Sequence, residues 1–220
     1  MTFQFNTVFE YWPMYLEGLR TTIYVTLGSL IFSLILSIPL AMIKITKNKI
    51  LNFIGFLYTD IFRALPSLVQ IYLVYFAAPQ LFGITFTAMT SAFITLSMNA
   101  AAYISEALRG GILSVDIGQR EAAKALGISQ VDTLKDIVLL QALKAVFPSM
   151  INETIGLLKG TSLVSIIGVV DLMRASRQVM ADSYLSFEPL MVAAVIYYIL
   201  VKSMSMIGNR LEKRIRVSEI

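Results

Sequence analysis

Five ionisable side chains stand inside or beside long apolar stretches of the sequence: Asp60, Arg63, Glu106, Glu153 and Lys159. Ionisable groups are costly in a lipid bilayer, and they usually face a cavity or an oppositely charged partner. The chemistry open to them is therefore mutual neutralisation or the recognition of a polar or charged solute.

Neutralisation within one helix is the simpler reading for two of these acids. Asp60 and Arg63 are three residues apart, as are Glu106 and Arg109. Residues at this spacing lie on the same face of a helix and can form an ion pair. For both pairs, a purely structural role competes with a binding role.

The acid Glu153 has a different setting, because it stands next to Asn152 among Gly, Pro, Ser and Thr residues. Glycine interruptions of an apolar stretch are typical of discontinuous helices that line binding cavities. The sequence therefore predicts that Asn152 and Glu153 line a cavity.

The missing residue types exclude much catalytic chemistry. The chain has no cysteine and no histidine, which removes thiol chemistry, the usual general base and the commonest metal ligand. An intramembrane protease would need two Asp residues or a Ser–Lys pair. Asp60 is the one Asp deep in an apolar stretch, and no other motif supports Ser162 with Lys159. Because no G-x-x-x-x-G-K-[S/T] phosphate loop occurs, an ATP-driven process would need a second chain.

Long uncharged stretches position these residues. Hydrophobic residues make up 57% of the 220 residues and charged residues only 15%, against about 25% charged in soluble domains. A transmembrane helix needs about 20 apolar residues, and the apolar stretches do not alternate as barrel strands do. We predict one all-α membrane domain over residues 1–220. Its five crossings lie at about residues 21–45, 51–77, 86–108, 145–170 and 189–208, and the fourth is interrupted by Pro148, Gly156, Gly160 and Gly168.

Lys and Arg residues concentrate in alternate connections. The loop after the first crossing, residues 109–144 and the tail after residue 208 are rich in them, whereas the opposite loops hold few. The positive-inside rule then places the N-terminus outside and the C-terminus in the cytoplasm. The same bias accounts for the basic pI of about 9.3 without a nucleic-acid partner. Residues 1–11 contain no Lys or Arg, so a cleavable signal peptide is not expected.

The polar segment at residues 109–144 has strong local signals. Arg120–Leu126 is rich in good helix formers, and Gly127 follows it as a C-cap. Ser129 or Asp132 can cap a second helix. The sequence predicts a short exposed helix and a tight turn, held between two membrane helices.

Part of this segment, Glu121–Gly127, reads E-A-A-K-A-L-G and follows Gly118 and Gln119. It resembles the E-A-A signature of ATP-binding-cassette (ABC) importer permeases, in which it forms a cytoplasmic coupling helix that sits in a groove of the ATPase subunit. The family pattern continues to an Ile-x-Leu-Pro segment. Here Leu140 stands where the proline is usual.

Further motifs resemble the polar amino-acid branch of that family, which carries histidine, glutamine, arginine or cystine. They occur in the family's order along nearly the whole chain, with Gly160 where Asp is common and Ala64-Leu65 in place of Gly-Thr. The matching segments are Tyr15–Leu19 with Thr21 and Thr22, Arg63–Gln70, Ala102–Glu106, Arg109–Ile112 and Lys159–Leu163.

The resemblance implies a type I ABC importer permease with a defined set of partners. An ABC ATPase dimer, which binds ATP and Mg, would dock on Gly118, Glu121, Ala122, Ala123 and Gly127. A second permease copy, identical or not, would complete the path, and an extracytoplasmic binding protein would deliver the substrate. The chain itself would hold no cofactor and would cross a bacterial cytoplasmic (inner) membrane several times.

An amino-acid substrate carries an ammonium and a carboxylate. Asp60 and Glu153 are suited to the ammonium or to a cationic side chain, and related permeases carry acids near these positions and an Asn at Asn99. Asn99, Thr161 and Ser162 are candidates for binding the carboxylate, and Asn152 lines the path beside Glu153. Two acids favour a basic or zwitterionic substrate.

A secondary transporter or a channel is the alternative. It would use the same membrane charges without an ATPase, and Glu121–Gly127 would then have no role. Co-purification of an ATPase, or uptake that survives loss of ATP while an ion gradient persists, distinguishes the two.

Overall fold

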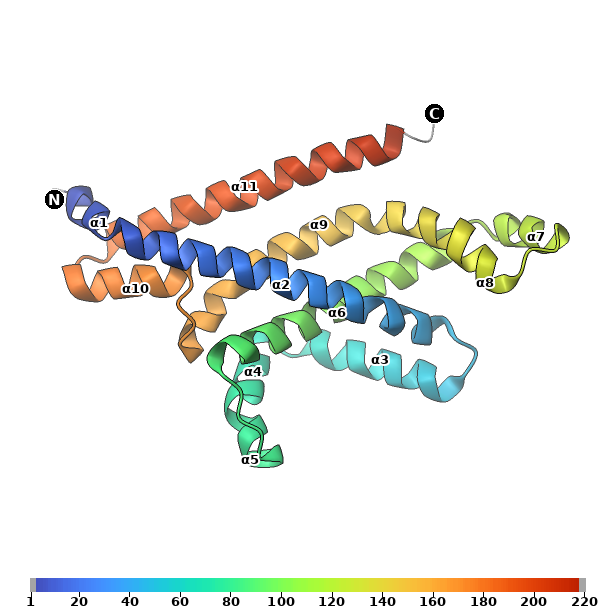
Figure 1. Ribbon diagram of the computed structural model, residues 1–220, viewed down its shortest axis with the longest axis horizontal. Helices are drawn as coiled ribbons and strands as arrows, with labels where there is room; N and C mark the ends of the chain where they lie inside the picture. Colours follow the sequence, from blue (N-terminus) through green and yellow to red (C-terminus); the bar gives the residue numbers. More distant parts are fainter. Residues whose placement is uncertain (1–2, 218–220) are drawn as a thin grey trace.

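The computed structural model describes residues 3–217, and every regular element in that range is a helix (Figure 1). The longest helices lie side by side along one direction, and shorter ones cross or extend their ends. In chain order the elements are α1 Phe5–Glu10, α2 Trp12–Ile45, α3 Lys49–Ala64, α4 Ser67–Tyr72, the π-helix η1 Leu73–Ala77, α5 Ala78–Phe82, α6 Ala88–Ser114, α7 Ile117–Ala125, α8 Gln130–Asp132, the π-helix η2 Thr133–Val138, α9 Leu139–Val164, the 3₁₀-helix η3 Ser165–Ile167, α10 Leu172–Ser183 and α11 Phe187–Val217.

Small residues line the buried face of α2. They recur every three or four residues, so they share one face of the helix. Small side chains let helix backbones approach closely where no hydrophobic effect drives association. Several of their hydroxyls bond to carbonyls of their own helix, as Ser33 does to Leu30 at 2.7 Å and Ser37 to Leu34 at 2.9 Å. The stripe comprises Gly18, Thr22, Thr26, Ser29, Ser33, Ser37 and Ala41.

Helix α6 lies at the centre of the bundle and packs against α2, α3 and α9. Its buried face combines large residues such as Leu96 and Ile104 with small ones, among which Ala100, Ala101 and Ala102 are fully buried. Ser91, Thr95 and Ser97 of α6, like Ser29 of α2, are also buried, and their hydroxyls have no hydrogen-bond partner among the described residues. These small side chains allow close packing but form no hydrogen bonds between α6 and the neighbouring helices of the described chain.

Two described helices are long and apolar enough to cross a membrane alone, Trp12–Ile45 and Phe187–Ile215. Two bent pairs qualify if each pair counts as one span, which gives up to four. The third predicted crossing, residues 86–108, lies in α6, which is not among them. Its Ser, Thr, Asn and Ala residues lower its hydropathy, as suits a helix enclosed by other helices. Judged by length and composition, the described helices therefore supply at most four membrane spans, one fewer than the five predicted.

The second predicted crossing, residues 51–77, is not one straight helix. The chain bends by 106° between Lys49–Ala64 and Ser67–Phe82. The bend falls at Leu65 and Pro66, because proline has no amide hydrogen and disfavours a helical conformation in the residue before it.

The prediction of an interrupted fourth crossing was wrong at Pro148, Gly156 and Gly160. Helix α9 runs unbroken from Leu139 to Val164 and contains Pro148, Gly156 and Gly160. The break comes later, at η3 and Gly168, which has a left-handed φ of 98°. The helices on either side of this break meet at a 49° bend.

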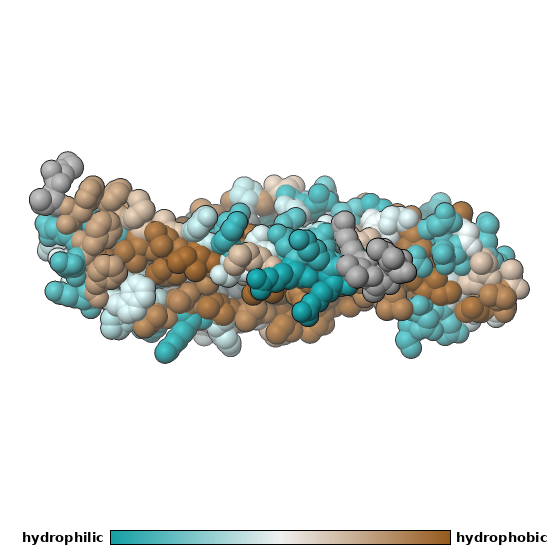
Figure 2. Space-filling model, turned by 90° about the horizontal axis from the view of Figure 1, so that it is seen from above, coloured by the Kyte–Doolittle hydropathy of each residue, from teal (hydrophilic) through white to brown (hydrophobic). Residues whose placement is uncertain are grey.

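Much of the surface is apolar. Figure 2 shows hydrophobic side chains along most of one face, with hydrophilic ones gathered toward the two ends and beside the C-terminal part of α11. Large exposed side chains of α2 include Ile31, Phe32 and Ile35, which are 56–62% exposed. Such a surface is suited to lipid or to a partner chain rather than to water.

Candidate functional site

The predicted docking helix is present as α7, and local capping fixes both of its ends. At the start, Asp116 Oδ1 accepts a 2.6 Å hydrogen bond from the amide of Gly118. At the end, Gly127 has a φ of 73°, which glycine adopts without the penalty that a Cβ brings. Its amide bonds to the Lys124 carbonyl, and that of Ile128 bonds to Ala123. The C-cap predicted at Gly127 is confirmed, and Ser129 caps α8 as one of the two predicted candidates.

The exposed face of α7 differs in one residue from the predicted docking set. Gly118, Glu121, Ala122 and Gly127 are exposed, whereas Ala123 is 2% exposed and faces the bundle. Beside them, three apolar side chains are strongly exposed, Ile117 at 71%, Leu126 at 79% and Val131 at 72%. Helix α7 thus has capped ends, and apolar side chains in and beside it are not covered by the rest of the described chain. Such a surface is suited to docking another protein.

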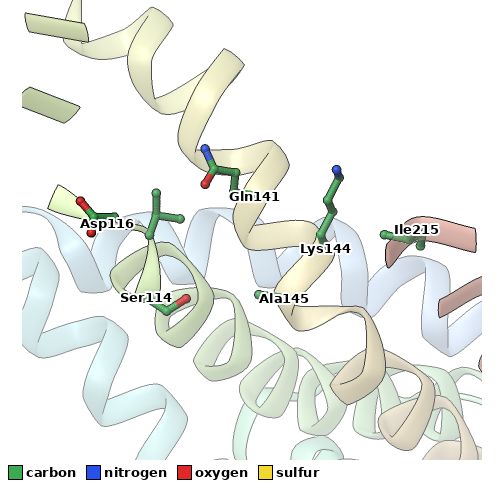
Figure 3. Close-up of a pocket in the computed structure, with 7 residues that line it drawn as sticks. Ser114, Asp116, Gln141, Lys144, Ala145 and Ile215 are labelled. Carbon is green, nitrogen blue, oxygen red and sulfur yellow. The ribbon is translucent and has the colours of Figure 1, made fainter. Parts of the chain in front are cut away.

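This face lies at one end of the molecule, far along the long axis from α1 and α10 (Figure 1). A pocket of about 310 Å³ opens beside the start of α7 (Figure 3). A second, mainly apolar pocket of about 560 Å³ lies between α2 and α6. None of the six predicted path residues lines either pocket. The first pocket is lined by Ser114, Val115, Asp116, Gln141, Lys144, Ala145 and Ile215.

Asp60 is exposed on α3 and forms no ion pair with a described residue. The alternative in which Arg63 neutralises it is not realised, because the Arg63 guanidinium lies over the ring of Tyr103 instead, 5.3 Å from its centroid. The carboxylate of Asp60 is therefore available to a ligand or to a partner chain.

The side chain of Asn99 holds the bend between α3 and α4. Pro66 lacks the amide that would bond to the Phe62 carbonyl in a regular helix. Gln70 Nε2 donates to that carbonyl and to the carbonyl of Leu65, both at 2.8 Å, and Asn99 Nδ2 donates to Phe62 O and Gln70 Oε1, both at 3.1 Å. Both amide hydrogens of Asn99 are thus in use, and its carbonyl oxygen Oδ1 is left to accept a bond.

Gln70 is 3% exposed, and its loss would leave the Leu65 carbonyl and one N–H of Asn99 without their hydrogen bonds, whereas Phe62 O would keep Asn99. We expect Gln70→Leu to lower the free energy of unfolding by about 1–3 kcal/mol for each buried group left unsatisfied. Thermal unfolding in detergent measures the effect. Gln178→Leu is the matched control, since Gln178 is exposed on α10. Equal stability of the two variants would contradict this role.

The four predicted path residues on α9 do not share one face. Asn152 is exposed, and Glu153 is half-buried without an ion pair among the described residues. Ser162 lies nine residues beyond Glu153, about 180° around the helix. Thr161 is fully buried and donates to the Leu158 carbonyl at 2.7 Å. Asn152 and Glu153 are thus the accessible members of the predicted set on α9, and Thr161 is enclosed by the bundle.

The predicted pair of Glu106 and Arg109 is confirmed: both Nε and Nη2 of the guanidinium bond to Glu106 Oε1. The sequence reading missed a second cation on the same acid, because Lys44 Nζ lies 3.0 Å from Glu106 Oε2. The sequence places Lys44 at the very end of the first predicted crossing, among the cations of the loop that follows. The one available signal was its position inside an otherwise helical pattern.

Comparison with known proteins identifies the family. Residues 33–217 match the model of the family described as binding-protein-dependent transport system inner membrane component. The chain is 43% identical over 202 residues to a Rickettsia bellii protein provisionally named as a glutamine transport system permease, covering 92% of this chain and 93% of the relative. It is 39% identical over 219 residues to the arginine transport system permease of Bacillus subtilis, with both chains fully covered.

Solved structures agree with the sequence relatives. The crystal structure of an amino acid ABC transporter with histidines matches with a TM-score of 0.91 at 32% identity, covering 97% of this chain and 100% of that one. An inward-facing methionine ABC transporter matches at 19% identity with a TM-score of 0.80, which shows the shared fold. Nearly the whole chain, including the capped α7, thus has its counterparts in one group of proteins, and it belongs to the family of binding-protein-dependent transport system inner membrane components.

Proposed function

We propose that this chain is the permease subunit of an ABC importer and carries a polar amino acid into the cytoplasm. The observation that carries this function is the near full-length match to amino-acid permeases, including a transporter solved with histidines. The exposed, capped α7 supports it, because a secondary transporter or channel has no use for a docking helix. The alternative of an ATPase-free transporter is not favoured.

The partners follow from this role. An ABC ATPase dimer binds ATP and Mg and docks on Gly118, Glu121, Ala122 and Gly127, with Ala123 supporting the helix from inside. Five crossings in a bacterial cytoplasmic membrane put the N-terminus outside and α7 in the cytoplasm. An extracytoplasmic binding protein delivers the substrate at the opposite end.

The substrate path runs between two permease copies. Asp60 and Asn152 are exposed on one chain, and Glu153 is half-buried beside Asn152, so a second copy is needed to enclose them. The carboxylates of Asp60 and Glu153 bind the ammonium or a cationic side chain. Asn99 contributes its free Oδ1 as a further acceptor, and Ser162 and Thr161 lie farther along α9.

Reconstitution tests the function. The chain is purified with its bound subunits, which mass spectrometry identifies, and the complex is placed in liposomes with the binding protein. We expect ATP-dependent uptake of labelled arginine, histidine or glutamine. Uptake driven by an ion gradient in the absence of an ATPase would overturn the proposal.

Glu153→Gln tests the path. A hydrogen bond to a charged group contributes about 1.5–3 kcal/mol, so we expect the half-saturating substrate concentration to rise about tenfold to a hundredfold. Glu17→Gln is the matched control, because Glu17 is an exposed acid on a different helix, α2. Uptake kinetics measure both. Unchanged kinetics in Glu153→Gln would remove this residue from the path.

A further inference from the structure

Lys44 is a buried cation that joins three helices. It lies near the end of α2 and is 3% exposed. Its ammonium donates to Thr59 Oγ1 of α3 at 3.0 Å, and to Ser105 Oγ and Glu106 Oε2 of α6 at 2.9 and 3.0 Å. An ammonium has three N–H donors, so all of them are used.

Much of the packing that holds α3 in place runs through Lys44. The two buried residues of α3 are Gly55 and Thr59. A Cβ at Gly55 would lie 2.7 Å from Lys44 Cγ, and Thr59 accepts the hydrogen bond described above. The side chain of Asn52 also donates to the Lys44 carbonyl at 2.6 Å. Both ends of the lysine therefore fix α3 against α2.

Stability alone does not require a charged group here. Replacing a buried ion pair with apolar side chains of similar volume is often neutral or stabilising, since burial removes the charges from water. What the pair adds is directional, because three bonds of fixed geometry set where α3 lies relative to α2 and α6.

The same cluster continues toward α7. Glu106 also binds Arg109, whose guanidinium lies 5.6 Å from the ring centroid of Phe56 on α3. Helix α6 ends only two residues before α7 begins, and Arg120 Nη2 of α7 donates to the Ile112 carbonyl of α6 at 2.6 Å. The last turns of α6 thus carry both the bond to α7, at Ile112, and the bonds to Lys44, at Ser105 and Glu106.

We propose that Lys44 is a positioning residue that makes α3 move together with α6 and α7. This inference rests on the proposed function, and it takes ATP hydrolysis by the docked ATPase to displace α7. Asp60 follows Thr59 directly on α3, so a movement of α7 would be passed to an acid of the path.

Lys44→Met tests this inference in the reconstituted complex, because methionine is an unbranched side chain only one atom shorter than lysine and carries no charge. We expect the variant to assemble and hydrolyse ATP with an unchanged KM for ATP, while the amino acid taken up per ATP falls at least tenfold. Lys47→Met is the matched control, since Lys47 is exposed three residues away and should keep the wild-type ratio. A wild-type ratio in an assembled Lys44→Met complex would overturn the proposal.

A second variant and a distance measurement keep the proposal testable if Lys44→Met does not assemble. Lys44→Met/Glu106→Gln removes both charges of the pair, and the same fall in uptake per ATP is expected. The chain has no native cysteine, so spin labels can be placed at Ile50 of α3 and Leu113 of α6, which are 72% and 56% exposed. We expect their separation to be the same with and without ATP when Lys44 is present. A separation that changes with ATP would overturn the proposal.

Failure of the proposed function would be seen in the wild-type complex rather than in the variants. A wild-type complex without an ATPase, or without ATP-dependent uptake, contradicts the importer role before any variant is compared. Normal uptake by the wild type together with a normal ratio in Lys44→Met contradicts only the role of Lys44.

Discussion

Gly127→Val is expected to separate ATP hydrolysis from uptake. Gly127 has a φ of 73°, a conformation that costs a residue with a Cβ about 1–2 kcal/mol, and a β-branched residue more. The turn between α7 and α8 would relax toward negative φ and displace the exposed end of α7. A free-energy cost of this size changes an equilibrium constant by a factor of about 5–30. We therefore expect the amino acid taken up per ATP to fall by about this factor, which transport assays in proteoliposomes measure.

Two further substitutions make this result specific. Gly127→Asn should stay close to wild type, because Asn tolerates the left-handed conformation better than other residues. Gly110→Val should also be neutral for the fold, since Gly110 has an ordinary φ and a Cβ there meets no atom within 4 Å. Coupling that is normal in Gly127→Val would remove α7's turn from the docking surface.

Gly18→Val is expected to have the largest effect on stability. A Cβ at Gly18 would lie 2.8 Å from the Asp171 carbonyl oxygen and 2.9 Å from Leu172 Cα. Both are backbone atoms and cannot rotate away. Overpacking typically costs about 1–3 kcal/mol and sometimes more, and we expect about 3 kcal/mol here because α10 must move as a unit.

The surroundings of Gly18 explain why such a shift would spread. Asp171 caps α10 through the amides of Met173 and Arg174, and Tyr197 of α11 donates to its Oδ2 at 3.2 Å. Thermal unfolding of the purified complex measures the loss, with Gly110→Val as the control of equal added volume. A melting temperature for Gly18→Val equal to that of the control would contradict the close approach of α2 and α10.

The features that the sequence predicted well are those fixed by local chemistry. Helix α7, its glycine C-cap and the serine cap of α8 depend on residues within one or two turns, so composition and spacing were enough. The pairing of Glu106 with Arg109 is local in the same sense.

The features that were missed depend on residues far apart in the chain. The bend at Pro66 looked like part of one apolar crossing, because its stabilisation comes from Gln70 and from Asn99, which is 37 residues away from its acceptor Phe62. Lys44 looked like a loop residue, because its burial requires acceptors 15, 61 and 62 residues away. The periodicity of apolar residues shows neither the hydrogen bonds at the bend nor those of Lys44.

The predicted breaks at Gly156 and Gly160 of α9 were wrong for another reason. Glycine permits a break but does not require one, and Gly156 and Gly160 adopt ordinary helical geometry here. The break follows at Gly168, where φ is positive. Which glycine ends the helix is decided by the packing of η3 and α10, which the sequence pattern does not contain.

The unpartnered hydroxyls of Ser29, Ser91, Thr95 and Ser97 on α2 and α6 have a mechanical consequence. None of them links one helix to another among the described residues, so sliding along these faces breaks no side-chain hydrogen bond. At the far end of α2, by contrast, the ammonium of Lys44 anchors it to α6. Its other end is anchored too, because the Leu172 amide donates to Thr22 Oγ1 at 3.1 Å and the Tyr15 hydroxyl donates to the Pro189 carbonyl at 3.1 Å. Helix α2 therefore resembles a beam supported at both ends, whose middle is held against α6 by packing alone.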